Sequence, residues 1–291
     1  MKTRRKKPAK NLEKSNNGSK VETRLFPIDR KSRGLFVSSA NSEELSKNII
    51  LKVREVATER NCGLVLHAGW SFRTSVNESK KSICESISEA IKGTSIKSYV
   101  AEILDVSQDE QTYFIISQHS QKISKIECLP QQFGQSGEIK EAEYFLNELG
   151  KVVPRNIANT SEHPCLLLIC GENNLFNRRN RKNDSPKIEA DSVSDRLLSC
   201  LKKIQNRRWC IFNPSHKPYK GLKIANSVMD FHSASSSDGR IWCVISGNNR
   251  SHIKLRSRIN QPLVWRDGTS NEMQLVFEDH KSSVYMYLFH P

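Results

Sequence analysis

Short unbroken runs of apolar residues, each ending in a polar cluster, are the dominant pattern of this chain. The clearest run extends from Cys165 to Ile169 and stops at Cys170, Gly171 and Glu172. A short apolar run without polar alternation is typical of a β-strand that is buried on both faces. In α/β proteins the ends of such strands carry chemistry, because they hold polar side chains rigidly at the surface. Cys170 is therefore a candidate functional thiol, and the alternative is a buried core cysteine.

Similar runs predict further strands, and apolar residues at helical spacing predict helices between them. The predicted strands cover residues 34–40, 64–66, 98–104, 113–117, 165–169, 209–212, 241–245, 263–265, 273–277 and 284–289, with a polar segment over 121–129. The predicted helices cover residues 42–60, 80–92, 192–205 and 221–232. Buried strands that alternate with helices indicate one layered α/β domain, here over residues 34–291.

The N-terminal segment differs in composition from this domain. Residues 1–34 hold twelve lysines and arginines against three acids, a net charge of +9, with few apolar residues. A segment of this kind cannot bury enough apolar surface to fold alone. We therefore expect residues 1–33 to form a disordered basic arm.

The whole chain carries a formal net charge of +15. Two further basic clusters lie at 178–182 and 202–208. Such clusters bind nucleic acid or another polyanion through phosphate contacts, and the alternative is a solvated surface. Nothing in the sequence resembles a zinc finger, a P-loop or an RNP motif.

Cysteine usage and hydropathy set the expected surroundings of the protein. The eight cysteines include no CxxC pair, so neither a zinc site nor a disulfide framework is indicated. No apolar run approaches the ~20 residues of a membrane helix. We expect a cytoplasmic protein without membrane contact, metal or cofactor.

Four strand-end signals stand in a fixed order: the strand after Leu66, then Lys125, Cys170 and Asn248. This order resembles the nitrilase, or carbon–nitrogen hydrolase, superfamily, whose pattern is a strand ending in a catalytic Glu, then a Lys, then a strand ending in Cys. Residues 124–129, followed by Gly137-Glu138, are similar to the family's Tyr-Arg-Lys-x-His-Leu … Gly-Glu stretch. Residues 167–172, 241–249 and 264–268 are similar to its nucleophile strand, its late Val-Tyr-Val-Val … Asn-Arg strand and its Asp-Pro-x-Gly turn.

The resemblance covers residues 35–290 and implies a four-layer α-β-β-α sandwich, commonly paired into a homodimer. It implies that Cys170 is the nucleophile, that Lys125 stabilises the oxyanion, and that Glu138 orients Lys125 or the substrate. These residue types suit the chemistry, because a nearby ammonium lowers the pKa of a thiol and stabilises a tetrahedral oxyanion.

One departure from the family pattern concerns the general base. The family's catalytic Glu falls here on Ala68, and no acid lies between Cys62 and Glu78. His67 is the nearest candidate to take the proton, although a hydrogen-bonded structural role is common for a histidine beside a strand end. Loss of a general base typically slows a reaction by ~10²–10⁴-fold.

Five further residues are candidates for substrate binding, because each lies at or beside a predicted strand end. They are Trp70, Glu172, Asn173, His216 and Asn248. Each also has a structural alternative, either as core or as the cap of a loop. The other seven cysteines are interpreted as buried fillers.

The sequence therefore predicts a nitrilase-like hydrolase that cleaves a C–N bond of a small amide-type substrate. The alternative is a nitrilase-fold protein that no longer catalyses and binds nucleic acid or a protein partner through its basic surface. The missing Glu favours the binding protein, whereas the presence of Lys125 and Cys170 favours the enzyme.

Overall fold

Two β-sheets and two helices make up the part of the chain that the computed structural model describes. These residues are 25–39, 46–75, 78–106, 110–119, 122–128, 162–168, 209–215, 229–230, 232–233, 235–237, 241–248 and 262–291, with the backbone alone for 110–111, 124–128 and 162.

The larger sheet, sheet B, has parallel strands at its centre. Its strands are β2 (Arg33–Ser39), β3 (Cys62–His67), β4 (Phe72–Arg73), β5 (Ser98–Asp105), β6 (Glu110–His119), β7 (Lys122–Cys128), β13 (Gln274–Asp279) and β14 (Val284–Phe289). Their order is β13-β14-β2-β3-β5-β6-β7, and β4 pairs with β5. Strands β2, β3 and β5 are parallel to one another, so their carboxyl ends lie at one edge of the sheet.

Sheet A has the same kind of centre. Its strands are β1 (Leu25–Asp29), β8 (Glu162–Leu167), β9 (Trp209–Ser215), β10 (Ile241–Asn248), β11 (Leu263–Arg266) and β12 (Thr269–Glu272), in the order β1-β8-β9-β10-β11-β12. Strands β8, β9 and β10 are parallel, and the other pairs are antiparallel.

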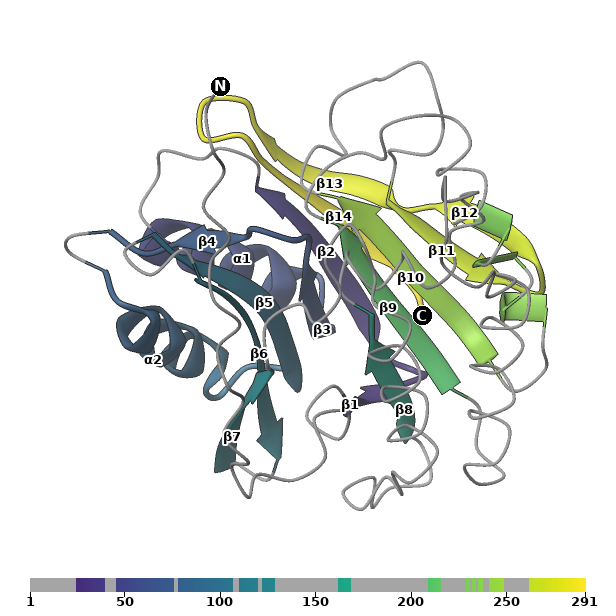
Figure 1. The fold of residues 1–291 in the computed structure, drawn as a ribbon, viewed down its shortest axis with the longest axis horizontal. Coiled ribbons are helices and arrows are strands. Elements are labelled where there is room, and N and C mark those ends of the chain that lie inside the picture. Colours follow the sequence, from purple (N-terminus) through teal and green to yellow (C-terminus); the bar gives the residue numbers. More distant parts are fainter. Residues whose placement is uncertain are drawn as a thin grey trace, which may run out of the picture.

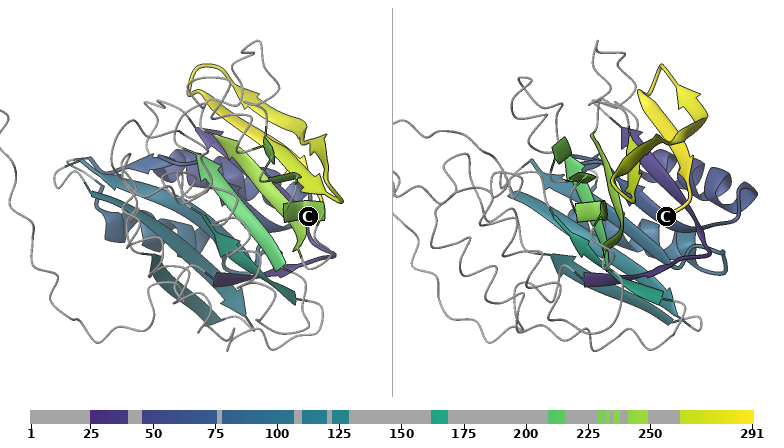
Figure 2. Two further views of the ribbon diagram at one scale, coloured as in Figure 1. Left: turned by 45° about the vertical axis from the view of Figure 1, so that its right-hand side comes forward. Right: turned by 90° about the vertical axis from the view of Figure 1, so that its right-hand side faces the viewer.

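The two sheets pack face to face, with the helices on the outer side of sheet B (Figures 1 and 2). Successive residues of β2 show the two sides. Phe36 belongs to the core between the sheets, whereas Leu35 and Val37 belong to the core beneath the helices. This alternation follows from the two-residue period of a strand, and both faces are apolar because both are covered.

Helices α1 (Ser46–Glu59) and α2 (Lys80–Ile91) present one apolar face each to sheet B. In α2 the buried face includes Ile83, Ile87 and Ile91, which lie four residues apart. The hydroxyl of Ser79 caps this helix by accepting a hydrogen bond from the Ser82 amide at 3.1 Å. Neither described helix is long and apolar enough to cross a membrane.

The predicted fold class is confirmed: the chain is an α/β protein with two sheets packed as a sandwich. The apolar runs that predict strands coincide with β2, β3, β5, β6, β8, β9, β10, β11, β13 and β14, and residues 42–60 and 80–92 contain α1 and α2. The helices predicted over 192–205 and 221–232, which would cover the outer side of sheet A, lie outside the described residues except for residues 229, 230 and 232.

Three strands, β1, the two-residue β4 and β12, correct or extend the sequence prediction. Strand β1 lies within the predicted arm, yet it pairs with β8 and buries Phe26 and Ile28 between the sheets. The arm therefore cannot extend to residue 33, and residues 1–24 lie outside the described part of the chain. Strand β12 was not predicted, because its four residues are polar and exposed.

A close approach between the sheets explains one glycine. A β-carbon on Gly247 of β10 would lie 2.4 Å from the ring of Phe36 in β2. Strand β10 can therefore lie against this ring only with a residue that has no side chain.

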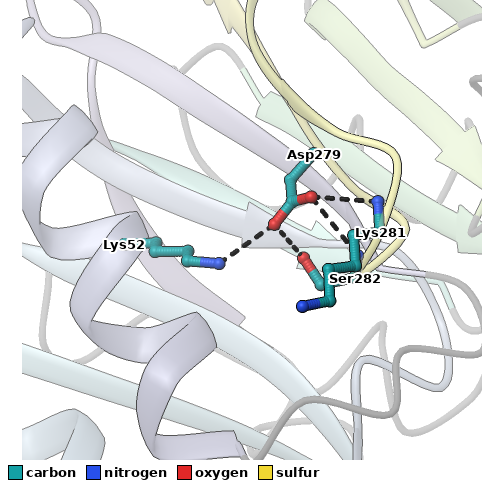
Figure 3. Close-up of polar contacts among 4 residues, drawn as sticks. All are labelled: Lys52, Asp279, Lys281 and Ser282. Carbon is teal, nitrogen blue, oxygen red and sulfur yellow. Dashed lines mark hydrogen bonds and ion pairs between the residues drawn. The ribbon is translucent and has the colours of Figure 1, made fainter.

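The turn between β13 and β14 is fixed to α1 through Asp279 (Figure 3). The carboxylate accepts hydrogen bonds from the Lys281 amide at 3.0 Å, the Ser282 amide at 3.3 Å and the Ser282 hydroxyl. It also forms an ion pair with Lys52 at 3.1 Å. The Ser282 hydroxyl, and next to it Lys52, lower the pKa of Asp279 far below its usual range. These contacts join the C-terminal hairpin to the helical layer.

We expect Asp279→Asn to lower the midpoint of thermal unfolding at pH 7. The lowered pKa means that the carboxylate stabilises the fold above the unfolded-state pKa of about 3.9, and that this stabilisation is lost as the pH falls below it. The difference between wild type and variant should therefore shrink below pH ~4. Glu278→Gln is the matched control on the preceding residue, and an equal loss in both variants would contradict the prediction.

Candidate functional site

The loop that follows β3 interrupts the pairing between β3 and β5. Leu66 lies opposite Val100, and pairing resumes where Phe72 lies opposite Ile103. The five residues 67–71 thus lie opposite only two, Ala101 and Glu102. Bulges of this kind are common beside active sites, because they redirect side chains while the flanking strands stay in register. We refer to residues 68–71, which follow the last residue of β3, as the β3 loop.

A buried carboxylate lies directly opposite the β3 loop. Glu102 is 1% exposed, and its Oε2 accepts a hydrogen bond from the Trp70 amide at 2.5 Å. Trp70 has a φ of 57°, a left-handed conformation that is a true outlier for a bulky side chain. Such backbone strain costs about 1–3 kcal/mol and gathers at functional sites.

The β3 loop is also fixed to both sheets. The Gly69 amide donates to the carbonyl of Ser215 at the end of β9, 3.2 Å away. Within the loop the Ser71 hydroxyl donates to the Ala68 carbonyl at 2.5 Å, and from β2 the Ser39 hydroxyl donates to the Ser71 carbonyl at 3.0 Å. The carboxyl ends of β2, β3 and β9 therefore meet at this loop.

A second group of buried polar residues lies at the ends of β8 and β9. The side-chain amide of Asn213 donates to the carbonyl of Leu168 at 2.7 Å, and its Oδ1 lies 3.3 Å from Nε2 of His232. Since Oδ1 can only accept, Nε2 of His232 carries a proton. Burial lowers the pKa of His232 to about 3, so the ring is neutral near pH 7.

Asn248, a predicted substrate-binding residue, lies beside this group. It is the last residue of β10, it is 2% exposed, and it is opposite Ser215 in the register of β9 and β10. The buried polar ends of β9 and β10 thus adjoin the β3 loop through Ser215.

His67, the predicted proton shuttle, is on the other side of sheet B. The neighbouring residues Leu66 and Ala68 belong to the core between the sheets, whereas His67 contacts the rings of Tyr99 and Phe72 in the helix-side core. Its Nε2 lies 2.7 Å from the Tyr99 hydroxyl, and its Nδ1 has no hydrogen-bond partner among the described residues. Burial lowers the pKa of His67 to about 3. A shuttle role for His67 stays a prediction that none of these contacts supports.

Of the other predicted site residues, the structure describes only Trp70 in full. For Lys125 it gives the backbone, which lies opposite Ile116 of β6, a residue buried in the helix-side core. Cys170, Glu138, Glu172, Asn173 and His216 lie outside the described residues.

Five of the seven cysteines interpreted as fillers are confirmed as buried free thiols: Cys62, Cys84, Cys165, Cys210 and Cys243. Cys165, Cys210 and Cys243 form a row across β8, β9 and β10, with 3.2 Å between the last two sulfur atoms. Burial raises the pKa of all three thiols, so they remain protonated near pH 7. No group of three metal-binding side chains occurs within the described part of the chain.

Sequence reasoning missed Glu102, Asn213 and His232. Glu102 had a detectable signal, because it is the single charge within the apolar stretch Tyr99-Val100-Ala101-Glu102-Ile103. Asn213 directly follows the strand predicted over 209–212, which indicates a strand end but not its contacts. Nothing near His232 in the sequence indicates that it reaches Asn213.

These features define an α/β protein with two sheets face to face and buried polar residues where parallel strands of both sheets end. No family model and no curated protein matches the sequence. Among solved structures, the chain is similar to Saccharomyces cerevisiae Nit3, a member of branch 10 of the nitrilase superfamily, with a TM-score of 0.44 and 10% identity over 89% of this chain and 91% of that chain. It is also similar to a glutamine-dependent NAD(+) synthetase from Cytophaga hutchinsonii, with a TM-score of 0.42 and 12% identity over 89% of this chain and 42% of that chain.

The buried state of His67 predicts a pH dependence of stability. Because its pKa is lowered in the folded protein, the unfolded chain binds a proton below pH ~6.5 that the folded protein does not. Stability should therefore fall as the pH decreases from 6.5, by at most ~1.4 kcal/mol per pH unit for each such histidine. His67→Gln should remove its share of this slope while retaining a partner for Tyr99.

The slope is measured by urea unfolding at pH 7.5, 6.0 and 5.0. His280→Gln is the matched control, because His280 also contacts a tyrosine hydroxyl, that of Tyr285 at 2.9 Å, but its side chain is 76% exposed. An unchanged slope in His67→Gln would show that His67 takes up protons in the folded protein, as a shuttle must.

Proposed function

We propose that this protein is a hydrolase that cleaves the carbon–nitrogen bond of a small amide-type substrate through the thiol of Cys170. The observation that supports this proposal is the hydrogen bond from Gly69 to Ser215, which joins the β3 loop to the end of β9. Strand β8 is parallel to β9 and lies beside it, and the Leu168 amide donates to the Phe212 carbonyl at 2.8 Å.

Cys170 follows Leu168 by two residues, and two residues of chain span at most ~7 Å. We therefore expect the thiol to lie near the polar strand ends of sheet A and the β3 loop of sheet B. The order of motifs in the sequence supports the same assignment, because the family that they resemble has its nucleophile at the corresponding strand end.

The proposed reaction has two stages. The thiolate of Cys170 attacks the amide carbon, the C–N bond breaks and the amine leaves with a proton, which gives a thioester. Water then attacks the thioester, the C–S bond breaks, and the carboxylic acid leaves while the thiol regains its proton. The net change is amide plus water to acid plus amine.

The roles of Lys125 and Glu138 in this proposal come from the sequence motifs. The ammonium of Lys125 would lower the pKa of the Cys170 thiol and stabilise the oxyanion, with Glu138 orienting it. Trp70, Glu172, Asn173, His216 and Asn248 are the proposed contacts to the substrate. The nucleic-acid-binding alternative requires none of these roles.

We expect Cys170 to react with iodoacetamide well below pH 8, where an ordinary thiol with a pKa of ~8.5 is mostly protonated. Peptide mass spectrometry identifies the modified residue. The background should be low, because the five described cysteines are buried. Lys125→Ala should move the alkylation profile to higher pH, whereas Lys122→Ala, three residues earlier on β7, should not.

If Cys170 reacts no faster than a cysteine in a short peptide, the catalytic proposal fails. The binding alternative then predicts salt-dependent retention of the full chain on immobilised nucleic acid, lost on deleting residues 1–24.

A further inference from the structure

The carboxyl group of Glu102 lies close to Ala68, the position where the family pattern has a catalytic Glu. Strands β3 and β5 are parallel, and Leu66 lies opposite Val100. Ala68 and Glu102 each lie two residues beyond this last pair on their own strands, and the Trp70 amide, two residues after Ala68, donates to the Glu102 carboxylate. Neighbouring strands lie ~4.8 Å apart, which is less than the reach of a glutamate side chain. A carboxylate on residue 102 can therefore occupy the space that a glutamate on residue 68 would occupy.

Both positions face the same layer of the molecule. Ala68 belongs to the core between the sheets. Glu102 alternates with Ala101 and Ile103, which belong to the helix-side core, so its side chain points toward the layer between the sheets. Its antiparallel neighbour Tyr113 also lies in the inter-sheet core. Ala68 adds only a methyl group to this layer.

The carboxylate is held in a fixed position. It is 1% exposed, and the Trp70 amide donates to its Oε2 at 2.5 Å. The same residue, Trp70, has a left-handed φ, a conformation that costs about 1–3 kcal/mol. The carbonyl of Ala68 accepts a hydrogen bond from the Ser71 hydroxyl, and the amide of Gly69 donates one to the Ser215 carbonyl. The backbone around Ala68 is therefore held in place as well.

A structural role alone does not require a carboxyl group here. A neutral glutamine oxygen could accept the same hydrogen bond from Trp70. Burying an ionised carboxylate costs several kcal/mol more than burying a neutral amide. A buried carboxyl group beside a strained backbone is an arrangement that gathers at functional sites.

We propose that Glu102 is the proton acceptor of this site, supplied by β5 in place of the acid that the β3 loop lacks at Ala68. The inference rests on the proposed function. During hydrolysis of the thioester, Glu102 takes a proton from the attacking water as the new C–O bond forms. It returns this proton to the sulfur of Cys170 as the C–S bond breaks, so that Glu102 and the thiol are both regenerated.

The test uses the full chain and the activated ester 4-nitrophenyl acetate at pH 7, with nitrophenolate release followed by stopped flow. A burst of one equivalent reports acylation of Cys170, and the steady rate that follows reports hydrolysis of the acyl-enzyme. Cys170→Ser should abolish the burst. Glu102→Gln, which retains an acceptor for Trp70, should keep the burst and slow the steady rate by ~10²–10⁴-fold.

A rescue variant distinguishes a chemical from a structural role. Ala68→Glu combined with Glu102→Gln returns a carboxylate to the same space from the neighbouring strand, and it should recover at least ~10-fold of the steady rate. Glu89→Gln, an exposed position on α2 whose side chain is 79% exposed, should change neither phase. If Glu102→Gln does not fold, as judged by circular dichroism, Glu102→Asp retains the charge but withdraws it by about one bond, and should slow the steady rate by ~10²-fold.

The outcomes separate the two proposals. A wild-type protein without a burst contradicts the proposed function, and the role of Glu102 falls with it. A wild-type burst with an unchanged steady rate in Glu102→Gln, or in Glu102→Asp where that variant is used, overturns the role of Glu102 alone. A slowed rate that the Ala68→Glu combination does not restore assigns Glu102 to holding the β3 loop and overturns its role in proton transfer.

Discussion

Burial of two sheets against each other is the constraint on which the rest of this structure depends. Side chains from both sheets form one core, so every central strand must be apolar on its inner face. Sheet B meets the same demand on its outer face, where α1 and α2 cover it. Polar side chains can then enter the interior only at strand ends, where the chain leaves the core. The polar residues Asn213, Ser215 and Asn248 all occupy such ends.

Glu102 departs from this pattern, because it is a buried carboxyl group away from a strand end. It lies within β5, but opposite the point where the β3 loop leaves the pairing. The loop presents a backbone amide to the carboxylate, and a strained Trp70 keeps that amide in place. On the other face of the sheet, in the helix-side core, the neutral side chains of His67 and Tyr99 share one hydrogen bond. Buried polar side chains are thus held by hydrogen bonds on both faces of sheet B.

The sequence predicts features that depend on local periodicity and misses those that depend on long-range contact. Isoleucines four residues apart predict α2, and apolar runs predict the central strands. The same periodicity could have placed His67, since it must face away from Leu66 and Ala68. Strand β1 was hidden because Phe26 and Ile28 stand among basic residues, and its burial depends on β8 far along the chain. The contact of Gly69 with Ser215 and that of Asn213 with His232 join separate segments, so no local pattern reveals them.

The two ends of the described chain complete opposite sheets. Strand β1 precedes all of sheet B yet pairs with β8 in sheet A, and β14, near the C-terminus, pairs with β2 at the start of sheet B. During synthesis neither sheet can complete its strand pairing when its first strands emerge, because their partners β8 and β14 are synthesised much later. Contacts so distant in sequence slow folding and leave strand edges open to wrong pairing. Until β14 is made, the edge of β2 that it covers is exposed, so the nascent chain is expected to depend on chaperones for longest at this edge.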